Sequence, residues 1–275
     1  MDACSQAATE KMLSFTGRSS LAGEDFLDIG CGSGLHSYAA LRAGARKIHS
    51  LDYDPDSVRA TDALHTHAAR PDNWTFERGD ILDDAYVEGL GKWSFVYSWG
   101  VLHHTGDMWR AIENAQKTVA DGGLFYLALY SADADFQPSK EFWLEVKQAY
   151  NNAGSLKKLY MVYWYIWRFA MQRDLKRLPA EVRRIFSYRF KRGMSYFADI
   201  RDWLGGWPME YAGDQETVDL LEKKHGFRLV NLSTGEANSE FLFERSGSPE
   251  LITCVKAFDQ TKGRITSPAP RNVVA

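Results

Sequence analysis

The chain has 275 residues, of which 45% are hydrophobic and 25% are charged. This composition is that of a folded globular protein and excludes the fibrous and disordered classes, and the length fits one large domain, with or without an insertion. The three cysteines stand far apart, which argues against a disulfide framework or a zinc knuckle and favours a reducing compartment, with the cytoplasm as the default. No basic segment followed by an apolar run opens the chain, and the longest aromatic-apolar run, at 159–167, is too short to span a bilayer. We expect neither a secretion signal nor a transmembrane segment.

The net charge of −3 hides an uneven distribution of charge along the chain. The stretch 140–201 holds 14 Lys and Arg against 5 Asp and Glu, a net charge of +9, which leaves −12 for the remainder. Such an asymmetry indicates that the two parts of the chain meet different ligands or partners.

Short apolar segments alternate with helix-forming segments up to Tyr130. We expect strands at 26–30, 46–53, 74–80, 95–100 and 123–130, and helices at 35–45, 55–69 and 108–120. Strands that alternate with helices predict a parallel sheet covered on both faces.

The alternation stops after Tyr130, and about 80 mainly helical residues follow that are rich in aromatic and basic side chains. It resumes with a helix at 214–226 and two strands at 227–234 and 239–245, joined by a turn suited to an antiparallel hairpin. The fold class is therefore α/β: a doubly wound, mostly parallel, seven-stranded Rossmann-like sheet with an antiparallel last strand and a helical cap inserted after strand five. The expected domains are a core at 1–130 and 214–245, a cap at 131–213, and a surface or unstructured tail at 246–275.

The first strand runs into a turn, "FLDIGCGSG", that contains glycines at 30, 32 and 34 and an acid, Asp28, two residues before the first glycine. Glycines remove side chains where a ligand approaches the backbone closely. The dinucleotide fingerprint has the spacing G-x-G-x-x-G and brings a pyrophosphate to a helix N-terminus. The spacing here is G-x-G-x-G, and a carboxylate beside it favours a ligand with a positively charged end.

Two more acids follow the next two strands. Asp52 ends the second strand, where a carboxylate accepts hydrogen bonds from ribose hydroxyls. Asp80 ends the third and is placed to reach an adenine amino group, with Tyr53 and Ile81 as apolar faces around the ring. Asp54, directly before Pro55, is expected to cap the following helix instead. A nucleoside with a positively charged tail would give each of the three remaining acids, Asp28, Asp52 and Asp80, a group to bind.

The segments "FLDIGCGSG", "LDYDPDS", "GDIL" and "SWGVLHHT", in this order, resemble the class I S-adenosylmethionine-dependent methyltransferases. The resemblance covers about 21–130 and 214–245. It implies S-adenosylmethionine as the cofactor and S-adenosylhomocysteine as the product, with the glycine turn around the aminoacid end and the acid of the second strand on the ribose. The cofactor-binding residues expected are Asp28, Gly30, Gly32, Gly34, Asp52, Tyr53, Asp80, Ile81 and Trp99, the last of which either borders the site or belongs to the core. The stretch 192–212, with "DWLGGWP", also resembles a segment of one bacterial subgroup.

His103 and His104 follow the fourth strand, where a side chain can face the transferred methyl group. His104 is the candidate general base, with a role in lining the site as the alternative. His103 is a candidate to bind the acceptor; the alternatives are that it lines the cofactor pocket or packs against the next helix. No third ligand stands at a regular spacing, so no metal site is expected.

The insertion supplies the remaining candidates for binding the methyl acceptor. They are Arg183, Arg184, Asp202, Trp203, Glu210 and Tyr211. The basic residues form either a solvated face or a site for an anion. The aromatic run at 159–169 packs the cap onto the sheet, forms a homodimer contact, lines an apolar acceptor site or faces a membrane surface.

The sequence as a whole predicts methyl transfer to an oxygen or nitrogen atom, in a hydroxyl, carboxylate or amine, of a small or medium-sized metabolite. The cap charge indicates that this metabolite is an anion. The alternatives are methylation of RNA or protein, a non-enzymatic module that binds the cofactor, and an NAD-dependent oxidoreductase. A sequence pI of about 6.2 argues against a general nucleic-acid surface.

Overall fold

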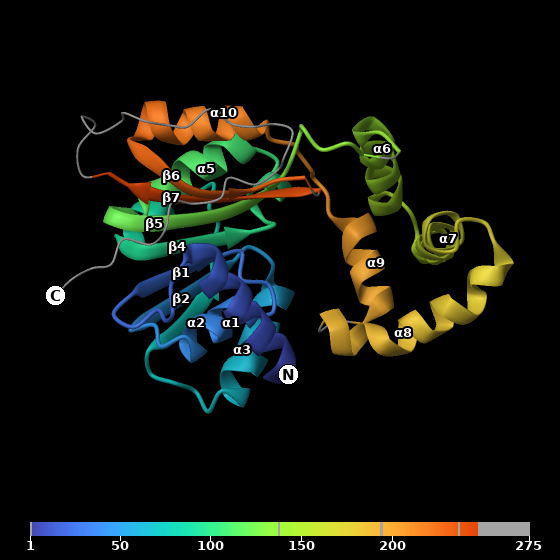
Figure 1. The fold of residues 1–275 in the computed structure, drawn as a ribbon, viewed down its shortest axis with the longest axis horizontal. Helices are drawn as coiled ribbons and strands as arrows, with labels where there is room; N and C mark the ends of the chain where they lie inside the picture. The colour runs from blue at the N-terminus through green and yellow to red at the C-terminus, as the bar shows by residue number, and fades with distance from the viewer. Residues whose placement is uncertain (1, 137, 193–194, 236, 247–275) are drawn as a thin grey trace. The chain divides into compact units, whose positions relative to one another are not determined.

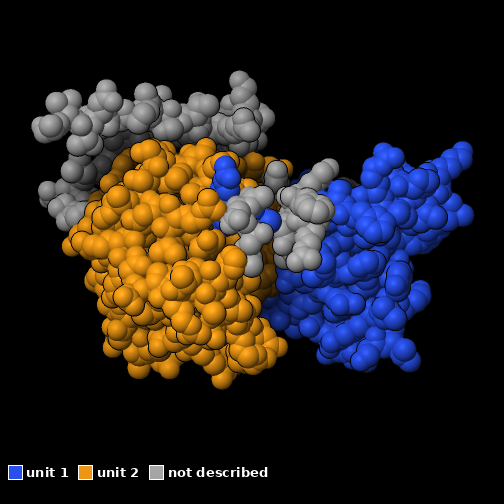
Figure 2. Space-filling model, turned by 90° about the horizontal axis from the view of Figure 1, so that it is seen from below, with its two compact units in different colours: residues 1–6, 135–209 blue, residues 7–134, 210–275 orange. Residues whose placement is uncertain are grey.

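The computed structural model describes residues 2–136, 138–192, 195–235 and 237–246 (Figure 1). The predicted tail, apart from its first residue, lies outside this range. The chain divides into two units, residues 1–6 with 135–209 and residues 7–134 with 210–275, coloured blue and orange in Figure 2.

Seven strands of the described chain form one sheet, in the spatial order β3-β2-β1-β4-β5-β7-β6. Their bounds are β1 Asp25–Ile29, β2 Lys47–Asp52, β3 Trp74–Arg78, β4 Trp93–Trp99, β5 Val119–Tyr130, β6 Phe227–Ser233 and β7 Asn238–Arg245. The first five strands pair in parallel, and β7 pairs antiparallel with both β5 and β6. The predicted α/β fold class, with its antiparallel last strand, is confirmed.

Helices cover both faces of this sheet, with α5 and α10 on one face and α1, α2 and α3 on the other (Figure 1). The helical segments associated with this unit are α1 Asp2–Thr16, α2 Leu35–Arg42, α3 Pro55–His67, α4 Asp84–Gly89, η1 Leu102–His104, α5 Met108–Lys117, α10 Asp214–Asp219 and η4 Leu220–Lys224. Residues 2–6 of α1 belong to the other unit. The patterns indicated α2, α3, α5 and the helix made of α10 and η4, but gave no signal for α1 or α4. α1 has only a weak apolar pattern, and α4 is six residues long.

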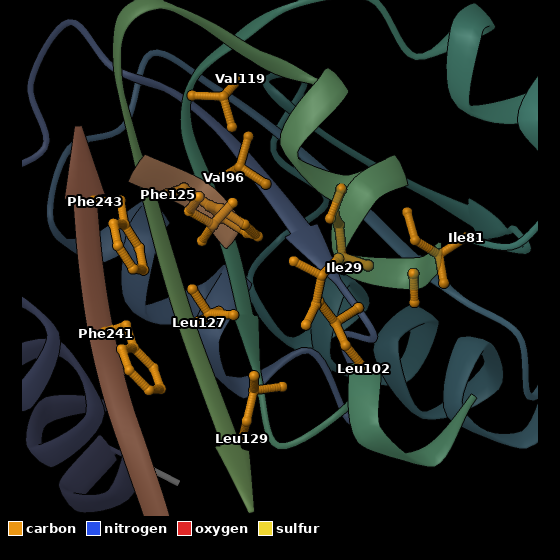
Figure 3. Packing of buried hydrophobic residues seen from close by; sticks show 14 of the residues in the cluster. Ile29, Ile81, Val96, Leu102, Val119, Phe125, Leu127, Leu129, Phe241 and Phe243 are labelled. Carbon is orange, nitrogen blue, oxygen red and sulfur yellow. The ribbon is translucent and has the colours of Figure 1, made fainter. Parts of the chain in front are cut away.

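The central strands β1, β4 and β5 are mostly buried because helices cover both faces of the sheet, whereas the edge strands β3 and β6 are partly exposed. In β5, Phe125, Leu127 and Leu129 point to the face that carries α5, whereas Leu124 and Tyr126 point to the face that carries α1 and α2. Figure 3 shows the first three beside aromatic side chains of β7. Each such buried side chain stabilises the fold by about 1.5–3 kcal/mol.

The unit of residues 135–209 is helical, as its sequence predicted. Its elements are α6 Lys140–Asn151, α7 Ser155–Tyr165, the π-helical η2 Ile166–Ala170, the short 3-10 turn η3 Leu175–Arg177, α8 Leu178–Arg192 and α9 Tyr196–Gly205. It has a hydrophobic core of its own, formed by Tyr150, Met161, Val162, Ile166, Met171, Tyr188, Tyr196, Ile200 and Leu204. Residues 131–134 and 210–213 belong to the sheet-bearing unit, where the backbone of Ala132 and Ala212 bonds at the end of β5.

Candidate functional site

The candidate site lies at the carboxyl ends of the parallel strands β1 to β4. Parallel strands end at one edge of the sheet, so the loops that follow them converge there. The glycine turn, Asp52, the segment around Asp80 and the histidines of η1 all follow these strand ends.

The three glycines of the first loop have φ angles of 76°, 55° and 77° at Gly30, Gly32 and Gly34, in the left-handed region that favours glycine. Gly30 is also required by packing, because a Cβ there would lie 2.3 Å from Val101 Cγ1. A Cβ on Gly32 would meet nothing within 4 Å, so open space adjoins the backbone at this position. The loop is therefore packed against protein at Gly30 and accessible at Gly32.

Asp52 connects the glycine loop to the loop after β2. Its Oδ2 accepts a hydrogen bond from the backbone N–H of Gly32 at 2.8 Å, and its Oδ1 accepts one from the N–H of Asp54 at 2.9 Å. A carboxylate has about four acceptor positions, so two remain for ribose hydroxyls. Asp54 accepts a hydrogen bond from the N–H of Asp56 at 3.1 Å, which confirms its predicted role as the cap of α3.

Asp28 lies under the loop, with only 2% of its surface exposed. The Ser37 hydroxyl, on α2, donates a hydrogen bond of 2.5 Å to Asp28 Oδ2. Burial raises the pKa of Asp28 to about 7; the Ser37 hydrogen bond opposes this shift and the nearby Asp52 carboxylate adds to it. A positive charge brought to the loop would favour the ionised form.

Two residues that bind the glycine loop or the acid before it were not identified in the sequence. The Thr61 hydroxyl, on α3, donates a hydrogen bond to the carbonyl of Gly32 at 3.1 Å, and its Oγ1 lies 3.0 Å from the position of a Cβ on Gly34. Ser37 is the second. A polar side chain at a helix position that faces the sheet was the available signal, since buried hydroxyls require partners.

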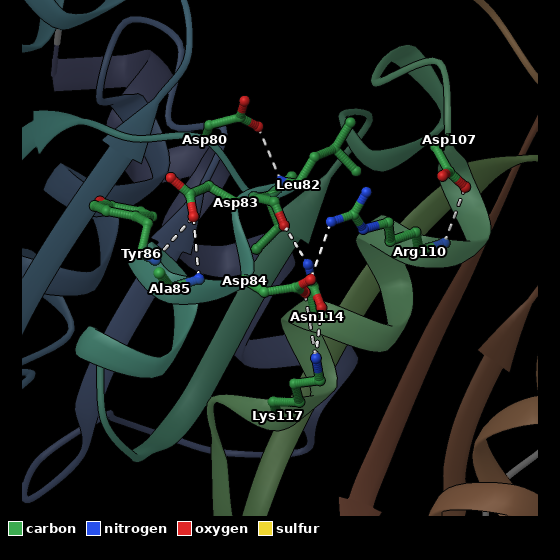
Figure 4. A network of polar contacts seen from close by, with 11 residues as sticks. Asp80, Leu82, Asp83, Asp84, Ala85, Tyr86, Asp107, Arg110, Asn114 and Lys117 are labelled. Carbon is green, nitrogen blue, oxygen red and sulfur yellow. Dashed lines mark hydrogen bonds and ion pairs between the residues drawn. The ribbon is translucent and has the colours of Figure 1, made fainter.

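Asp80 follows β3 by two residues rather than ending it, because β3 ends at Arg78. Its Oδ1 accepts a hydrogen bond from the N–H of Leu82 at 2.8 Å, which shapes the turn into α4 (Figure 4). Ile81 is buried in the hydrophobic core on the α5 face. Tyr53 is 64% exposed, and the Arg78 guanidinium lies 5.2 Å from the centre of its ring.

Trp99 ends β4 and is half-buried. The ring of His36 lies 6.2 Å from its ring, and Lys11 Nζ lies 5.0 Å from it. Burial lowers the pKa of His36 to about 4, so this imidazole is neutral at physiological pH. Trp99 thus has neighbours on both α1 and α2.

The two histidines of η1 lie beside the end of β5. The His103 ring is buried, with its centre 4.3 Å from the ring centres of both His104 and Tyr130. His104 is half-buried, and its ring centre lies 5.7 Å from that of Tyr130. His104 is therefore the more accessible of the two.

Glu210 and Tyr211 lie next to these histidines. The N–H of Glu210 donates to the carbonyl of His103 at 2.9 Å, and Glu210 Oε2 accepts a hydrogen bond of 2.9 Å from the N–H of Met108, the first residue of α5. The ring centres of Tyr211 and Tyr130 are 6.2 Å apart. Glu210 thus caps a helix, a contact that its sequence neighbours do not reveal.

The other acceptor candidates belong to the helical unit. Arg183 is exposed, and Arg184 lies 3.8 Å from Glu181 and stacks near Tyr188. Asp202 is on the exposed side of α9.

Trp203 is part of an aromatic and cationic group in the same unit. Its ring centre lies 5.3 Å from that of Trp143 and 4.1 Å from Nζ of the buried Lys147, which donates a hydrogen bond to the Trp203 carbonyl. Burial lowers the pKa of Lys147 to about 8, and the nearby Asp202 carboxylate opposes the shift.

Within the described ranges no group of three or more His, Cys, Asp or Glu could hold a metal ion. None of the helices in that part of the chain is both long and apolar enough to cross a membrane.

A family model described as a methyltransferase domain matches residues 6–189, more than half of the chain. The chain is 32% identical over 108 residues to a ubiquinone biosynthesis O-methyltransferase from Methylobacterium sp. (strain 4-46). This similarity spans 39% of the chain and 41% of the relative, so less than half of that protein is matched.

Solved structures share the fold at low sequence identity. An O-methyltransferase family protein from Burkholderia thailandensis matches with a TM-score of 0.55 and 12% identity, covering 90% of this chain and 59% of that one. A magnesium protoporphyrin IX methyltransferase from Synechocystis PCC 6803 with bound S-adenosylhomocysteine matches with a TM-score of 0.52 and 16% identity, covering 89% of this chain and 84% of that one. The chain belongs to the methyltransferase-domain family, and the identification of a class I S-adenosylmethionine-dependent methyltransferase from its motifs is confirmed.

Proposed function

We propose that the protein transfers the methyl group of S-adenosylmethionine to an oxygen or nitrogen atom of a small or medium-sized anionic metabolite. The observation that carries the proposal is the Asp52 carboxylate bonded to the Gly32 N–H, beside backbone with open space. In the cofactor the ribose is joined to the aminoacid chain. A fixed carboxylate can bind the ribose, and the accessible backbone beside it leaves room for the aminoacid chain.

In this proposal the described residues fit the parts of the cofactor in order along the sheet edge. Asp52 holds the ribose hydroxyls, the segment of Asp80 and Tyr53 contacts the adenine, and the glycine loop surrounds the aminoacid end above Asp28. The bound cofactor supplies a methyl group on a good leaving group. The protein has to align the acceptor and exclude water, so no nucleophilic side chain is required.

A hydroxyl acceptor would need a base, and His104 is our candidate. It is half-buried beside Tyr130, and the Methylobacterium relative is named an O-methyltransferase, which supports an oxygen acceptor. If His104 takes the proton, His104→Gln lowers kcat at least tenfold at neutral pH and removes the acidic limb of the pH profile. An unchanged pH profile would assign the histidine to lining the site.

The preference for an anion rests on the charge of the cap. Arg183→Ala is expected to weaken acceptor binding several-fold and to leave the affinity for S-adenosylmethionine unchanged. Arg59→Ala, which removes an exposed arginine on α3, is the matched control. Equal losses of both affinities would contradict the role of Arg183, and the same comparison applies to Arg184.

The test of the cofactor site is a calorimetric titration with S-adenosylmethionine, S-adenosylhomocysteine and NADH. Micromolar binding of the first two is expected, with at least a tenfold loss in Asp52→Ala and no loss in Asp72→Ala, which removes an exposed loop acid. Binding of NADH alone would favour the oxidoreductase alternative. Tight cofactor binding without turnover of any acceptor in a broad panel would favour a non-enzymatic module.

Other predictions accompany the proposal. Methylation of RNA or protein stays the alternative substrate class, and a salt-dependent affinity for RNA would favour it. Four further expectations also stay predictions. Two concern the whole protein: a homodimer through the aromatic run and a cytoplasmic location. The other two are the assignment of 131–213 as the acceptor-binding cap and the resemblance of 192–212 to one bacterial subgroup.

A further inference from the structure

Exposed apolar side chains concentrate in one part of the helical unit. Between residues 156 and 186 the exposed large hydrophobic residues are Leu156, Leu159, Tyr160, Tyr163, Trp167, Leu175, Leu178, Val182 and Phe186. In the rest of the described chain only Tyr53 and Trp207 are of this kind. Large apolar side chains that are exposed in such number are typical of sites of interaction with proteins or membranes.

The first five residues form a row along α7 and into η2. Leu156, Tyr160, Tyr163 and Trp167 are spaced by three or four residues, so they follow one side of the helix, and Leu159 lies beside them. Leu156 is 85% exposed and Tyr160 67%. The other side of the same segment supplies Met161, Val162 and Ile166 to the unit's own core. The segment is therefore apolar on its outer side as well as its inner side.

The remaining four residues form a second row along η3 and α8. Leu178, Val182 and Phe186 recur every four residues and follow one side of α8, and Leu175 precedes them by less than one turn. Phe186 is 77% exposed. Glu181 and Tyr188, by contrast, are buried on the inner side of the helix.

Basic residues accompany both rows. Lys157 stands beside the first, and Lys176, Arg177 and Arg183 stand among the residues of the second. The stretch 140–201 carries a net charge of +9. A second copy of the chain would bring a surface of the same sign against this one, and like charges oppose such an association.

We propose that these two rows, Leu156 to Trp167 and Leu175 to Phe186, form a docking surface for an anionic lipid bilayer. Tyr, Trp and Phe side chains favour the boundary between headgroups and acyl chains, and Lys and Arg attract anionic headgroups. α7 has 11 residues, too few to span a bilayer, so its outer row enters the interface only. The docking surface contains none of the cofactor residues. It shares Arg183 with the proposed acceptor site, but its test uses neither cofactor nor acceptor and so does not depend on the proposed function.

The test is vesicle flotation of the whole purified chain, without cofactor or acceptor. Vesicles of phosphatidylcholine mixed with phosphatidylglycerol are expected to bind the protein at least about tenfold more strongly than pure phosphatidylcholine, and the difference is expected to shrink at high salt. Failure to bind the anionic vesicles, or equal binding to both kinds, would overturn the proposal.

Substitutions in the rows separate the bilayer from other occupants. Leu156→Ser with Tyr160→Ser, and separately Leu175→Ser with Phe186→Ser, should each reduce vesicle binding at least about fivefold with little change in Tm, because each of these side chains is about two-thirds or more exposed. Tyr53→Ser, at an equally exposed aromatic residue of the other unit, is the control and should retain binding. Unchanged binding in both row variants would contradict the proposal. A dimer detected by light scattering that these variants dissociate, without vesicle binding, would assign the surface to a second copy.

Discussion

The two carboxylates next to the glycine loop have different environments. Asp52 is half-buried and accepts hydrogen bonds from two backbone N–H groups, whereas Asp28 is buried against Ser37. Burial without a cationic partner raises the pKa of Asp28 to about 7. Ionisation of Asp28 therefore destabilises the ligand-free fold. Ionisation becomes favourable when a ligand brings a positive charge to the loop.

This shift makes stability depend on pH. In the unfolded chain an aspartate ionises near pH 4, but in the fold Asp28 keeps its proton until about pH 7. Between these values the folded state binds more protons, so stability falls as pH rises, by up to about 4 kcal/mol, and then stays level. Asp28→Asn should be more stable than the parent at pH 8 and similar at pH 4.5 in urea titrations without cofactor. Equal stability of the two proteins at pH 8 would contradict the assignment, and Asp72→Asn is the control.

Gly30 and Gly32 should respond differently to alanine. Gly30→Ala forces a Cβ against Val101 at a positive φ and is expected to cost a few kcal/mol of stability. Gly32→Ala has room for its Cβ, so it should cost only about 1 kcal/mol from its φ angle while lowering the affinity for S-adenosylmethionine at least tenfold. Chemical denaturation and calorimetry on both variants measure the two effects. A Gly32→Ala protein with unchanged cofactor affinity would show that the ligand does not use this space.

At the scale of elements, the start of α5 depends on a residue about a hundred positions away. Asp107 accepts a hydrogen bond from the N–H of Arg110 at 3.4 Å, and Glu210 accepts one from the N–H of Met108. A carboxylate at a helix N-terminus satisfies open N–H groups and interacts favourably with the helix dipole. On the same helix, Arg110 and Lys117 lie 3.0 Å and 3.5 Å from Asp84 of α4 (Figure 4).

Glu210 was predicted to bind the acceptor, and its capping contact gives a way to separate the two roles. Glu210→Ala should cost about 1 kcal/mol of stability, while Glu210→Gln, which keeps an acceptor oxygen, should lose less. If Glu210 only caps α5, the acceptor KM is unchanged in Glu210→Gln. A raised KM with normal stability in that variant would support acceptor binding.

At the scale of the molecule, each unit has its own hydrophobic core. Leu204 is fully buried in the core of the helical unit, and Leu127 in that of the sheet. Separate cores predict that local unfolding of one unit need not open the other.

A cavity placed in each core tests this prediction. Leu204→Ala and Leu127→Ala should each cost about 2–5 kcal/mol in the unit that contains them. In hydrogen exchange read by mass spectrometry, Leu204→Ala should speed exchange in α6, α7 and α9 and leave β1, β4 and β5 unchanged. Faster exchange throughout the chain would show one cooperative unit instead.

The sequence by itself determined the fold class, the cofactor and the strand-end acids. Alternating apolar and helical segments specify strands and helices locally, and the spacing of Gly30, Gly32 and Gly34 before a helix is a local pattern as well. The cap role of Asp54 was predictable for the same reason, because its partner Asp56 is two residues away.

Only the tertiary structure decided which side chains hold the loop and which remain on the surface. Thr61 reaches Gly32 across 29 residues, and Glu210 reaches Met108 across 102, so the partner of neither side chain can be identified from its neighbours along the chain. The burial of Asp28 and the exposure of Tyr163 likewise depend on how helices cover the sheet and one another. The physical reason is that hydrogen bonding and burial are set by neighbours in space, whereas periodicity and spacing record only neighbours along the chain.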